Sequence, residues 1–245
     1  MASPVRPPWR RWGREAGFVF LGGLDRLWPR LWIILAAVAL GMGAVLLFSP
    51  QDNALLAHIR VPDAPRTDNV AKFLSQWGDL NGAGPLAILI WVLGAISSRV
   101  RWRKLGLALL MACLVSGLIL NIFRIGTGRP RPYYQHAHPE VMDKFYGPQP
   151  GKGYMQSFPS GHACTSATTG SALGAVSPVL VLPGAAYAVA VSWSRLQLDR
   201  HHPIDILVGA TIGITCGLSF ASTVPGAWIK LRRRRKSAGR RLARR

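Results

Sequence analysis

Three polar clusters interrupt the apolar pattern of this sequence, and their residue types suit anion binding and group transfer. In the first, Arg124 is followed by six residues and then by Arg131-Pro132. The second reads Phe-Pro-Ser-Gly-His over residues 158–162. The third is Ser-Arg, five residues, His, three residues and Asp, over residues 194–205. Arginines, a serine, two histidines and an aspartate together can hold a charged group and transfer it.

The arginines of these clusters indicate a site for phosphate. Arg124, Arg131 and Arg195 carry fixed positive charge and forked donors that match phosphate oxygens. Ser160 and Gly161 lead directly into a predicted helix, whose first amide groups and dipole favour an anion. The serine adds a hydroxyl donor, and the glycine lets the backbone approach a ligand closely. The residues therefore predict a phosphate cradle.

The histidines could supply the covalent step and the proton transfers. His201 and Asp205 are four residues apart, so on a helical turn they share a face. A carboxylate there can hold one ring nitrogen and leave the other to attack phosphorus. His162, at the start of another helix, is placed to protonate the leaving oxygen. This arrangement requires no metal ion and no cofactor.

The clusters resemble the three signature motifs of the type 2 phosphatidic acid phosphatase superfamily. The family's first motif is lysine, six residues and Arg-Pro, and here Arg124 takes the lysine position before Arg131-Pro132. The second motif, Pro-Ser-Gly-His, matches Pro159–His162 in full. The third motif matches at Ser194, Arg195, His201 and Asp205.

The resemblance implies a six-helix membrane phosphatase with a phosphohistidine intermediate. It implies His201 as nucleophile, His162 as acid and then as base for water, and Asp205 as the residue that orients His201. Arginine in place of lysine keeps the charge and changes the donor geometry, which could tune rate or substrate. The resemblance assigns phosphate binding to Arg124, Arg131, Ser160, Gly161 and Arg195.

Other residues near the motifs have simpler interpretations. Arg129-Pro130 forms a second, out-of-register Arg-Pro pair, and a juxtamembrane anchor is the alternative role for its arginine. His202, next to a proline, is interpreted as a structural or loop residue. His136, His138 and Glu140 alternate along the chain and could form a metal site, since imidazole and carboxylate suit several metals. The loop setting favours instead a polar cap over residues 133–157 that shapes access to the site.

Composition indicates a membrane protein. Hydrophobic residues make up 49% of the chain and charged residues 16%, below the quarter or so typical of soluble domains. The net charge of +20 also suits a nucleic-acid binder, but the basic residues flank apolar spans and no stacking platform or helix-turn-helix is present. We therefore expect membrane lipids and a lipid phosphate as partners, and no nucleic acid. The cysteines fall within apolar segments, where they behave as small hydrophobes: Cys113, Cys164 and Cys216.

The expected fold is all-α, a bundle of six transmembrane helices. The fourth span is rich in small residues over 163–175, which allow close helix packing. Residues 64–80 have the spacing of an amphipathic helix on the membrane surface, either a lid or a plain surface helix. The first span, long enough to cross and without a clear cleavage site, is interpreted as a retained anchor. The six spans are Leu31–Phe48, Pro85–Ser97, Leu105–Phe123, His162–Val176, Val179–Trp193 and Ile204–Ala221.

The distribution of lysine and arginine sets the expected orientation. With six spans, twenty of the thirty basic residues fall on the side of the two termini, which the positive-inside rule places in the cytoplasm. A basic cytoplasmic segment (1–30) then precedes the membrane domain (31–222), and a basic, disordered cytoplasmic tail (223–245) follows it. The segments 50–84, 124–161 and 194–203 are then on the opposite, periplasmic side of a bacterial-type inner membrane, and the three motifs are expected at that face.

The expected activity is removal of phosphate from a lipid. Polyprenyl pyrophosphate, phosphatidylglycerol phosphate, phosphatidic acid and lipid A 1-phosphate all satisfy one phosphate cradle, and the sequence does not choose among them. Three rival functions use the same residues: a lipid-to-lipid phosphotransferase, a non-catalytic binder or transporter of lipid phosphates, and a vanadate-dependent haloperoxidase. The predicted spans disfavour the last, and the intact histidines disfavour the binder.

Overall fold

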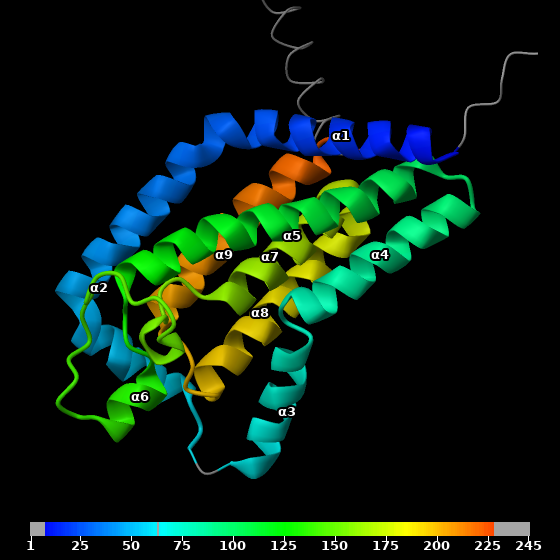
Figure 1. Cartoon of the computed structure of the whole chain (residues 1–245). Helices are drawn as coiled ribbons and strands as arrows, with labels where there is room; N and C mark the ends of the chain where they lie inside the picture. Colours follow the sequence, from blue (N-terminus) through cyan, green and yellow to red (C-terminus); the bar gives the residue numbers. More distant parts are fainter. Residues whose placement is uncertain (1–7, 63, 228–245) are drawn as a thin grey trace, which may run out of the picture.

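The computed structural model describes residues 8–62 and 64–227, and this part of the chain is helical with no β-strand (Figure 1). Three short 3-10 turns, at Trp28–Arg30, Gly153–Met155 and Pro178–Leu180, connect or flank the helices. The helices are α1 Pro8–Leu27, α2 Leu31–Ile59, α3 Pro65–Gln76, α4 Leu80–Ile96, α5 Val100–Thr127, α6 Pro132–Ala137, α7 Gly161–Val176, α8 Val181–Gln197 and α9 Pro203–Ala221.

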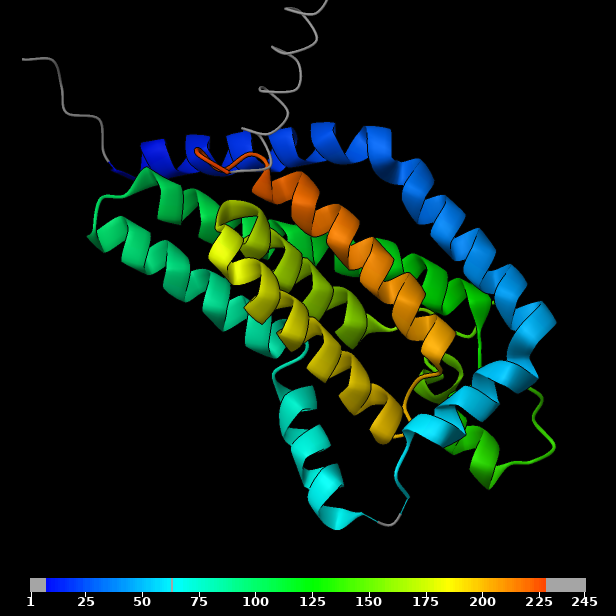
Figure 2. The ribbon, with the colours of Figure 1, turned by 180° about the vertical axis from the view of Figure 1, so that it is seen from behind.

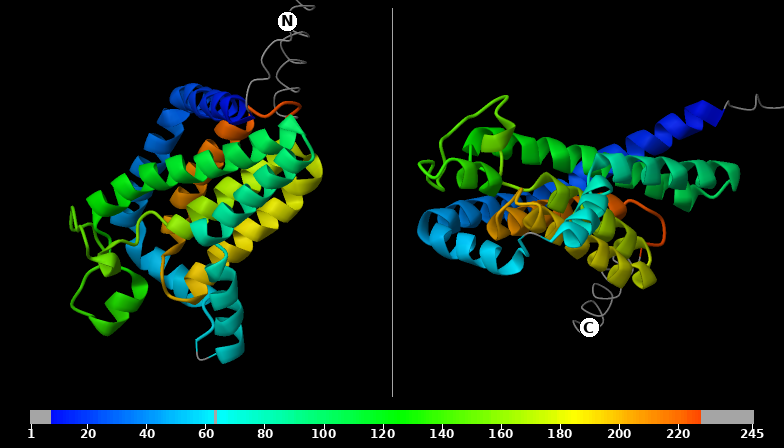
Figure 3. Two further views of the ribbon diagram at one scale, coloured as in Figure 1. Left: turned by 45° about the vertical axis from the view of Figure 1, so that its right-hand side comes forward. Right: turned by 90° about the horizontal axis from the view of Figure 1, so that it is seen from below.

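The helices form a bundle with two different ends. Helices α4, α5, α7, α8 and α9 run side by side, and α1 lies across one end of them (Figure 1). The short helices α3 and α6 project from the opposite end, together with the long segment between α6 and α7 (Figure 3). The polar segments are therefore gathered at the end away from α1.

Helix α7 forms the centre of the bundle. It packs against α5, α8 and α9, and in the view from behind it lies between α8 and α9 (Figure 2). Small side chains make this possible: a Cβ added at Gly213 of α9 would overlap the carbonyl oxygen of Cys164. The predicted small-residue span is thus confirmed as a tightly packed helix, with a length of only 16 residues.

Helix α2 is longer than the predicted first span. The span was expected to end at Phe48, but the helix continues to Ile59 across a kink at Phe48, whose backbone angles are non-helical. Pro50 lies just beyond this kink and lacks the N–H that a straight helix would use. The kink directs the last turns of α2, including the buried Asp52, toward the polar end of the bundle.

Each predicted span lies at least mostly within a helix, although fewer helices qualify as membrane spans by themselves. Among the described residues four helical segments are long and apolar enough to cross a membrane, within Arg11–Ile59, Val100–Ala137, Pro178–Gln197 and Pro203–Ala221. The pair α3 and α4, bent by 48°, makes a fifth if it counts as one span. Helix α7 is too short to qualify as a membrane span by itself. Because neighbouring helices enclose it, it needs little apolar surface of its own.

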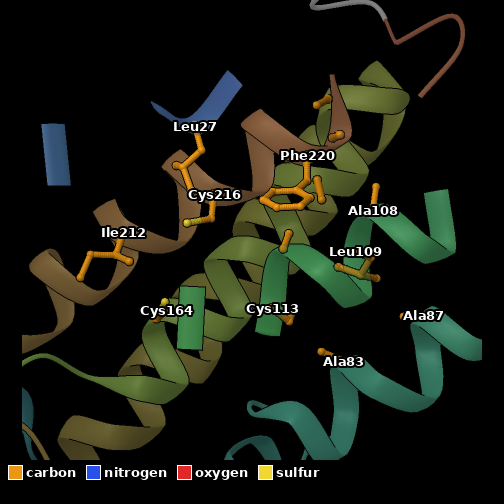
Figure 4. Packing of buried hydrophobic residues seen from close by; sticks show 14 of the residues in the cluster. Leu27, Ala83, Ala87, Ala108, Leu109, Cys113, Cys164, Ile212, Cys216 and Phe220 are labelled. Atoms are coloured by element: carbon orange, nitrogen blue, oxygen red, sulfur yellow. The ribbon is translucent and has the colours of Figure 1, made fainter. Parts of the chain in front are cut away.

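The helical interior is apolar and contains the three cysteines. Cys113, Cys164 and Cys216 are buried and unpaired, on α5, α7 and α9 respectively (Figure 4). Ile212 and Phe220 of α9 lie in the same core (Figure 4). The interpretation of the cysteines as small packing residues agrees with this placement.

The segment ahead of the first span contains a helix that the sequence analysis did not identify. In α1, the carboxylate of Glu15 makes a two-pronged ion pair with Arg103 of α5, at 2.8 and 3.0 Å. Helix α3 confirms the predicted amphipathic helix, within shorter bounds, and packs against α8. The basic tail predicted to be disordered lies outside the described residues from residue 228 onward.

Candidate active site

The three sequence clusters meet at the polar end of the bundle. Arg124 is in the last turn of α5, Ser160 directly precedes α7, and Arg195 is in the last turn of α8. His201 lies in the loop between α8 and α9, and Asp205 in the first turn of α9. The Ser160 backbone N–H donates to the carbonyl oxygen of Asp205 at 3.0 Å, which joins the second cluster to the third.

His201 is held by a backbone carbonyl. Its Nδ1 lies 2.8 Å from the Ser157 carbonyl oxygen and 3.8 Å from Oδ2 of Asp205, so the expected direct hydrogen bond to Asp205 is corrected by this geometry. Because a carbonyl oxygen only accepts, Nδ1 carries the proton and Nε2 keeps its lone pair. Burial, with smaller contributions from the charges of Arg131 and Arg195, lowers the pKa of His201 to about 3. The ring is therefore neutral at physiological pH.

Asp205 orients His201 indirectly, through the segment that precedes α7. Its Oδ2 accepts hydrogen bonds from the Ser157 hydroxyl at 2.6 Å and from the His202 backbone N–H at 2.9 Å. Since Ser157 also supplies the carbonyl that holds His201, the carboxylate fixes that carbonyl in place. His202 is fully buried, with Nε2 3.1 Å from Gln135 Oε1, which agrees with its predicted structural role.

Arg129 is the centre of a buried ionic group, here called the carboxylate cluster, formed with Asp52, Asp143 and Asp205. Its guanidinium contacts the three carboxylates at 2.8, 2.7 and 2.6 Å, and its side chain is 0% exposed. Burial acts to lower the pKa of Arg129, but the three carboxylates outweigh this and raise it. The sequence analysis interpreted Arg129 only as part of an out-of-register Arg-Pro pair or as a juxtamembrane anchor. It missed Asp52 and Asp143, because ion pairing between residues distant in sequence has no local sequence signal.

Arg124, Arg131 and Arg195 form a second group, here called the arginine pocket. In each of them Nε is buried and has no hydrogen-bond partner among the described residues. Burial lowers the pKa of Arg131, because no carboxylate is bonded to it. Unpaired buried donors are costly, so three of them together are suited to binding an anion. Each arginine makes one contact through another guanidinium nitrogen. Arg124 donates to Asn121 Oδ1 at 2.5 Å, Arg131 donates to the Gln156 carbonyl oxygen at 3.4 Å, and Arg195 donates to Ser75 Oγ.

The start of α7 adjoins the arginine pocket. Ser160 is the N-cap, with Oγ 3.5 Å from the Ala163 amide nitrogen. A Cβ at Gly161 would lie 3.2 Å from Nη1 of Arg124, so glycine leaves room for that guanidinium. Gly209 of α9 is equally constrained, because a Cβ there would overlap the Ser160 carbonyl oxygen. The helix N-terminus and the arginines are therefore placed to act on one anion.

His162 lies on the more open side of the site, next to a residue that the sequence analysis missed. Its Nε2 is 3.9 Å from Oδ2 of Asp79, the N-cap of α4. The side chain of His162 is 23% exposed, compared with 2% for His201. A Cβ at Gly78 would lie 3.3 Å from the His162 ring, so the α3–α4 turn packs directly on the histidine. Asp79 could have been suspected as an N-cap ahead of an apolar run.

The alternative metal site is not assembled. His136 Nδ1 contacts Asp199 Oδ2 at 2.7 Å, whereas His138 Nδ1 contacts Glu140 Oε1 at 3.3 Å. The two histidines thus pair with different acids. In the described part of the chain, no three His, Cys, Asp or Glu side chains are grouped to hold a metal ion.

Comparisons with known proteins agree with the geometry. The chain is 26% identical over 239 residues to the lipid A 1-phosphatase of Rhizobium johnstonii, covering 85% of this chain and 95% of that protein. It is 29% identical over 176 residues to the decaprenylphosphoryl-5-phosphoribose phosphatase of Mycobacterium tuberculosis, covering 70% and 88%. The crystal structure of a PAP2 type phosphatidylglycerolphosphate phosphatase from Bacillus subtilis superposes with a TM-score of 0.58 at 21% identity, covering 82% and 94%, and so shares the fold.

The model of the PAP2 superfamily matches residues 105–229, which include all three polar clusters and more than half of the chain. That family is the one whose motifs the sequence resembles. With the motif residues gathered at one end of a helical bundle, the conclusion is that this chain belongs to the PAP2 superfamily.

Proposed function

We propose that the protein is an integral membrane phosphatase that removes a phosphate or pyrophosphate group from a lipid. The observation that carries the proposal is the arginine pocket: three guanidinium groups, each with a buried and unpaired Nε, beside a helix N-terminus. A phosphate oxygen is the ligand that such donors fit. The relatives named above, which are lipid phosphatases by name, support the same reaction class.

In the first step, Nε2 of His201 attacks phosphorus, the N–P bond forms and the bond from phosphorus to the lipid oxygen breaks. The Nδ1 hydrogen bond to the Ser157 carbonyl keeps the ring in the tautomer with its lone pair on Nε2. His162 gives its proton to the leaving lipid oxygen. Arg124, Arg131 and Arg195 stabilise the charge that develops on the transferring group. These residues supply the nucleophile, the proton donor and the charge stabilisation, so the proposed step does not require a metal ion.

In the second step, water replaces the lipid. His162, now neutral, takes a proton from that water, which attacks phosphorus, breaks the N–P bond and releases inorganic phosphate. The proton taken from water replaces the one that His162 gave to the lipid oxygen, and the Asp79 carboxylate lies 3.9 Å from the ring. The same pair of histidines therefore serves both steps.

The membrane arrangement belongs to the proposal. Helices α2, α4, α5, α7, α8 and α9 are the six spans, with both termini in the cytoplasm and the site at the periplasmic surface of an inner membrane. In the sequence, twenty of the thirty lysines and arginines flank the spans on the side of the two termini, which supports a cytoplasmic position for that side under the positive-inside rule. The name of the Rhizobium relative makes lipid A 1-phosphate the first substrate to test. Polyprenyl pyrophosphate is second, because an undecaprenyl-diphosphatase of Sulfolobus acidocaldarius is 27% identical over 147 residues.

The test is phosphate release by the purified protein in detergent. We expect the wild type to release phosphate from at least one lipid in a panel containing lipid A 1-phosphate, polyprenyl pyrophosphate, phosphatidic acid and phosphatidylglycerol phosphate. We expect His201→Gln to lower the rate by about 10⁴-fold or more, because the nucleophile is lost. Acid-labile, base-stable phosphate should accumulate on quenched wild-type protein and not on this variant.

His138→Gln is the matched control, since His138 is exposed and outside the site. It should retain the wild-type rate. Full activity in the His201 variant, or no release from any lipid by a folded wild type, would refute the proposal. Phosphate that appears only when an acceptor lipid is added would instead identify a phosphotransferase.

A further inference from the structure

We propose that a groove between α4 and α8, here called the α4–α8 groove, binds one hydrocarbon chain of the lipid whose phosphate occupies the arginine pocket. This inference rests on the proposed function and specifies how the substrate's apolar part is held. The groove has a volume of about 290 Å³, and its floor is α7. Its walls include Trp77, Leu86 and Tyr187, and its floor includes Thr169 and Leu173.

The groove and the catalytic histidine lie on the same face of α7. Thr169 and Leu173 follow His162 by seven and eleven residues, which are two and three turns of an α-helix. The two floor residues are therefore aligned below His162, along the direction that leads from the polar end of the bundle into the membrane. A lipid with its phosphate near His162 would direct its chain along this face.

A single turn of chain forms the boundary between site and groove. Trp77 lines the groove, Gly78 packs against His162 and Val191, and Asp79 places its carboxylate 3.9 Å from His162 Nε2. The turn therefore adjoins both the site and the groove. The exposure of His162, greater than that of His201, shows that the site opens on this side.

The wall of the groove marks the level of the membrane interface. The Tyr187 hydroxyl donates to the Trp77 carbonyl oxygen at 2.7 Å across the end nearest the site. Tryptophan and tyrosine concentrate where headgroups meet hydrocarbon. The remaining wall and floor are nearly all apolar or glycine, so the matching occupant is an alkyl or prenyl chain that extends from the interface into the membrane.

A larger groove, of about 790 Å³, lies between α8 and α9. Two of its lining residues, Leu196 and Ile206, pack with the buried Leu56 and Ala163. Gly170 of α7 and Gly184 of α8 meet with no room for a Cβ and divide the two grooves. Of these two grooves, only the one between α4 and α8 adjoins the turn that packs on His162.

The first test fills the groove. Leu86 of α4 lines it and is 36% exposed, so Leu86→Trp can occupy the groove without disturbing the bundle core. Leu89→Trp, on an exposed part of the same helix outside the groove, is the matched control. We expect Leu86→Trp to raise KM for the long-chain lipid phosphate by about tenfold and to leave kcat/KM for a water-soluble phosphomonoester within about twofold of wild type.

Leu89→Trp should change neither value. Equal effects of the two tryptophan variants, or equal losses on long-chain and soluble substrates in Leu86→Trp, would overturn the proposal. A control variant is informative here because both substitutions add the same side chain to the same helix.

The second test does not depend on turnover. The probe is a lipid phosphate with a diazirine at the end of one chain, bound to the full-length His201→Gln protein in lipid nanodiscs. We expect the label on α4, α8 or the His162 face of α7. Labelling confined to the α8–α9 side would overturn the proposal. An inactive wild type that is still labelled in the groove would count against the proposed phosphatase reaction and in favour of this binding site.

Discussion

The carboxylate cluster and the arginine pocket are neighbours with opposite properties. Arg129 and Arg131 are separated by one proline, and Arg129 is fully buried whereas Arg131 is half-buried. Arg129 contacts three carboxylates at 2.6–2.8 Å, whereas Arg131 makes one contact of 3.4 Å and has an unpaired Nε. The pKa shifts follow the same division, raised for Arg129 and lowered for Arg131. Adjacent arginines of one motif thus have different physical roles.

The difference shows how the site is built. In the carboxylate cluster the charges are paired without a ligand. Through Arg129, Asp52 and Asp205 the cluster connects three parts of the chain, which are α2, α9 and the segment that precedes α7. The arginine pocket is incomplete and has donors in excess. A rigid, satisfied group beneath an unsatisfied one is the arrangement that preorganises a binding site, because the donors need not move when the anion arrives.

We expect the largest effect on stability from replacing Arg129, whose guanidinium is the cation of the carboxylate cluster. Arg129→Met leaves buried carboxylates without their partner, a loss that typically costs about 3–5 kcal/mol. We expect the thermal unfolding midpoint in detergent to fall by roughly 10 °C, with loss of phosphate release as a consequence. Circular dichroism or tryptophan fluorescence against temperature measures the first effect.

Arg131→Met is the matched control for that prediction. Since Arg131 has no carboxylate partner, its replacement should leave the unfolding midpoint within about 2 °C of wild type, or raise it, while phosphate release falls by orders of magnitude. Equal destabilisation by the two substitutions would remove the distinction between cluster and pocket.

A second prediction concerns the open side of the arginine pocket, where His162 is expected to protonate the leaving oxygen. For His162→Gln, kcat/KM for a lipid phosphate should fall by about 10²–10⁴-fold, because an alkoxide is a poor leaving group. For an aryl phosphate with an acidic phenol, the loss should be less than about tenfold, because that leaving group needs no proton. Phosphate-release rates for the two substrates measure the ratio.

Arg195→Gln provides the comparison for the histidine variant. Its guanidinium acts on the phosphate in both reactions, so the two substrates should lose activity equally. Were His162→Gln to impair both substrates to the same extent, the histidine would be a phosphate-binding residue like the arginines.

The sequence predicted the contents of the arginine pocket more completely than those of the carboxylate cluster. Arg124, Arg131 and Arg195 lie in motifs with fixed spacing, and helical periodicity placed their segments at the ends of apolar spans. Asp52 is different: it follows a kink at Phe48 that extends α2 past the predicted end of its span. Its contact with Arg129 joins residues 77 positions apart, which no local pattern encodes.

The same limit applies to His201, the proposed nucleophile. The spacing of His201 and Asp205 predicted that the two side chains lie together, since residues four apart share a helical face, and Nδ1 of His201 lies 3.8 Å from Oδ2 of Asp205. It could not indicate that Asp205 would act through Ser157, because that contact depends on how the segment before α7 packs against α9. Local spacing therefore identified the members of the site, and tertiary packing determined which member touches which.

The smallest expected effect tests whether the arginine pocket tolerates a change of donor geometry. Arg124 stands where the family motif has lysine, with Nη2 bonded to Asn121 and Nη1 near Gly161. Arg124→Lys keeps the charge beside the α7 N-terminus and loses the forked donor, so we expect kcat/KM to fall by about threefold. Arg195→Lys, where one guanidinium nitrogen already contacts Ser75, should cost more because the fork spans Ser75 and the phosphate. A larger loss at Arg124 than at Arg195 would mean that the fork of Arg124, and not its charge, holds the phosphate.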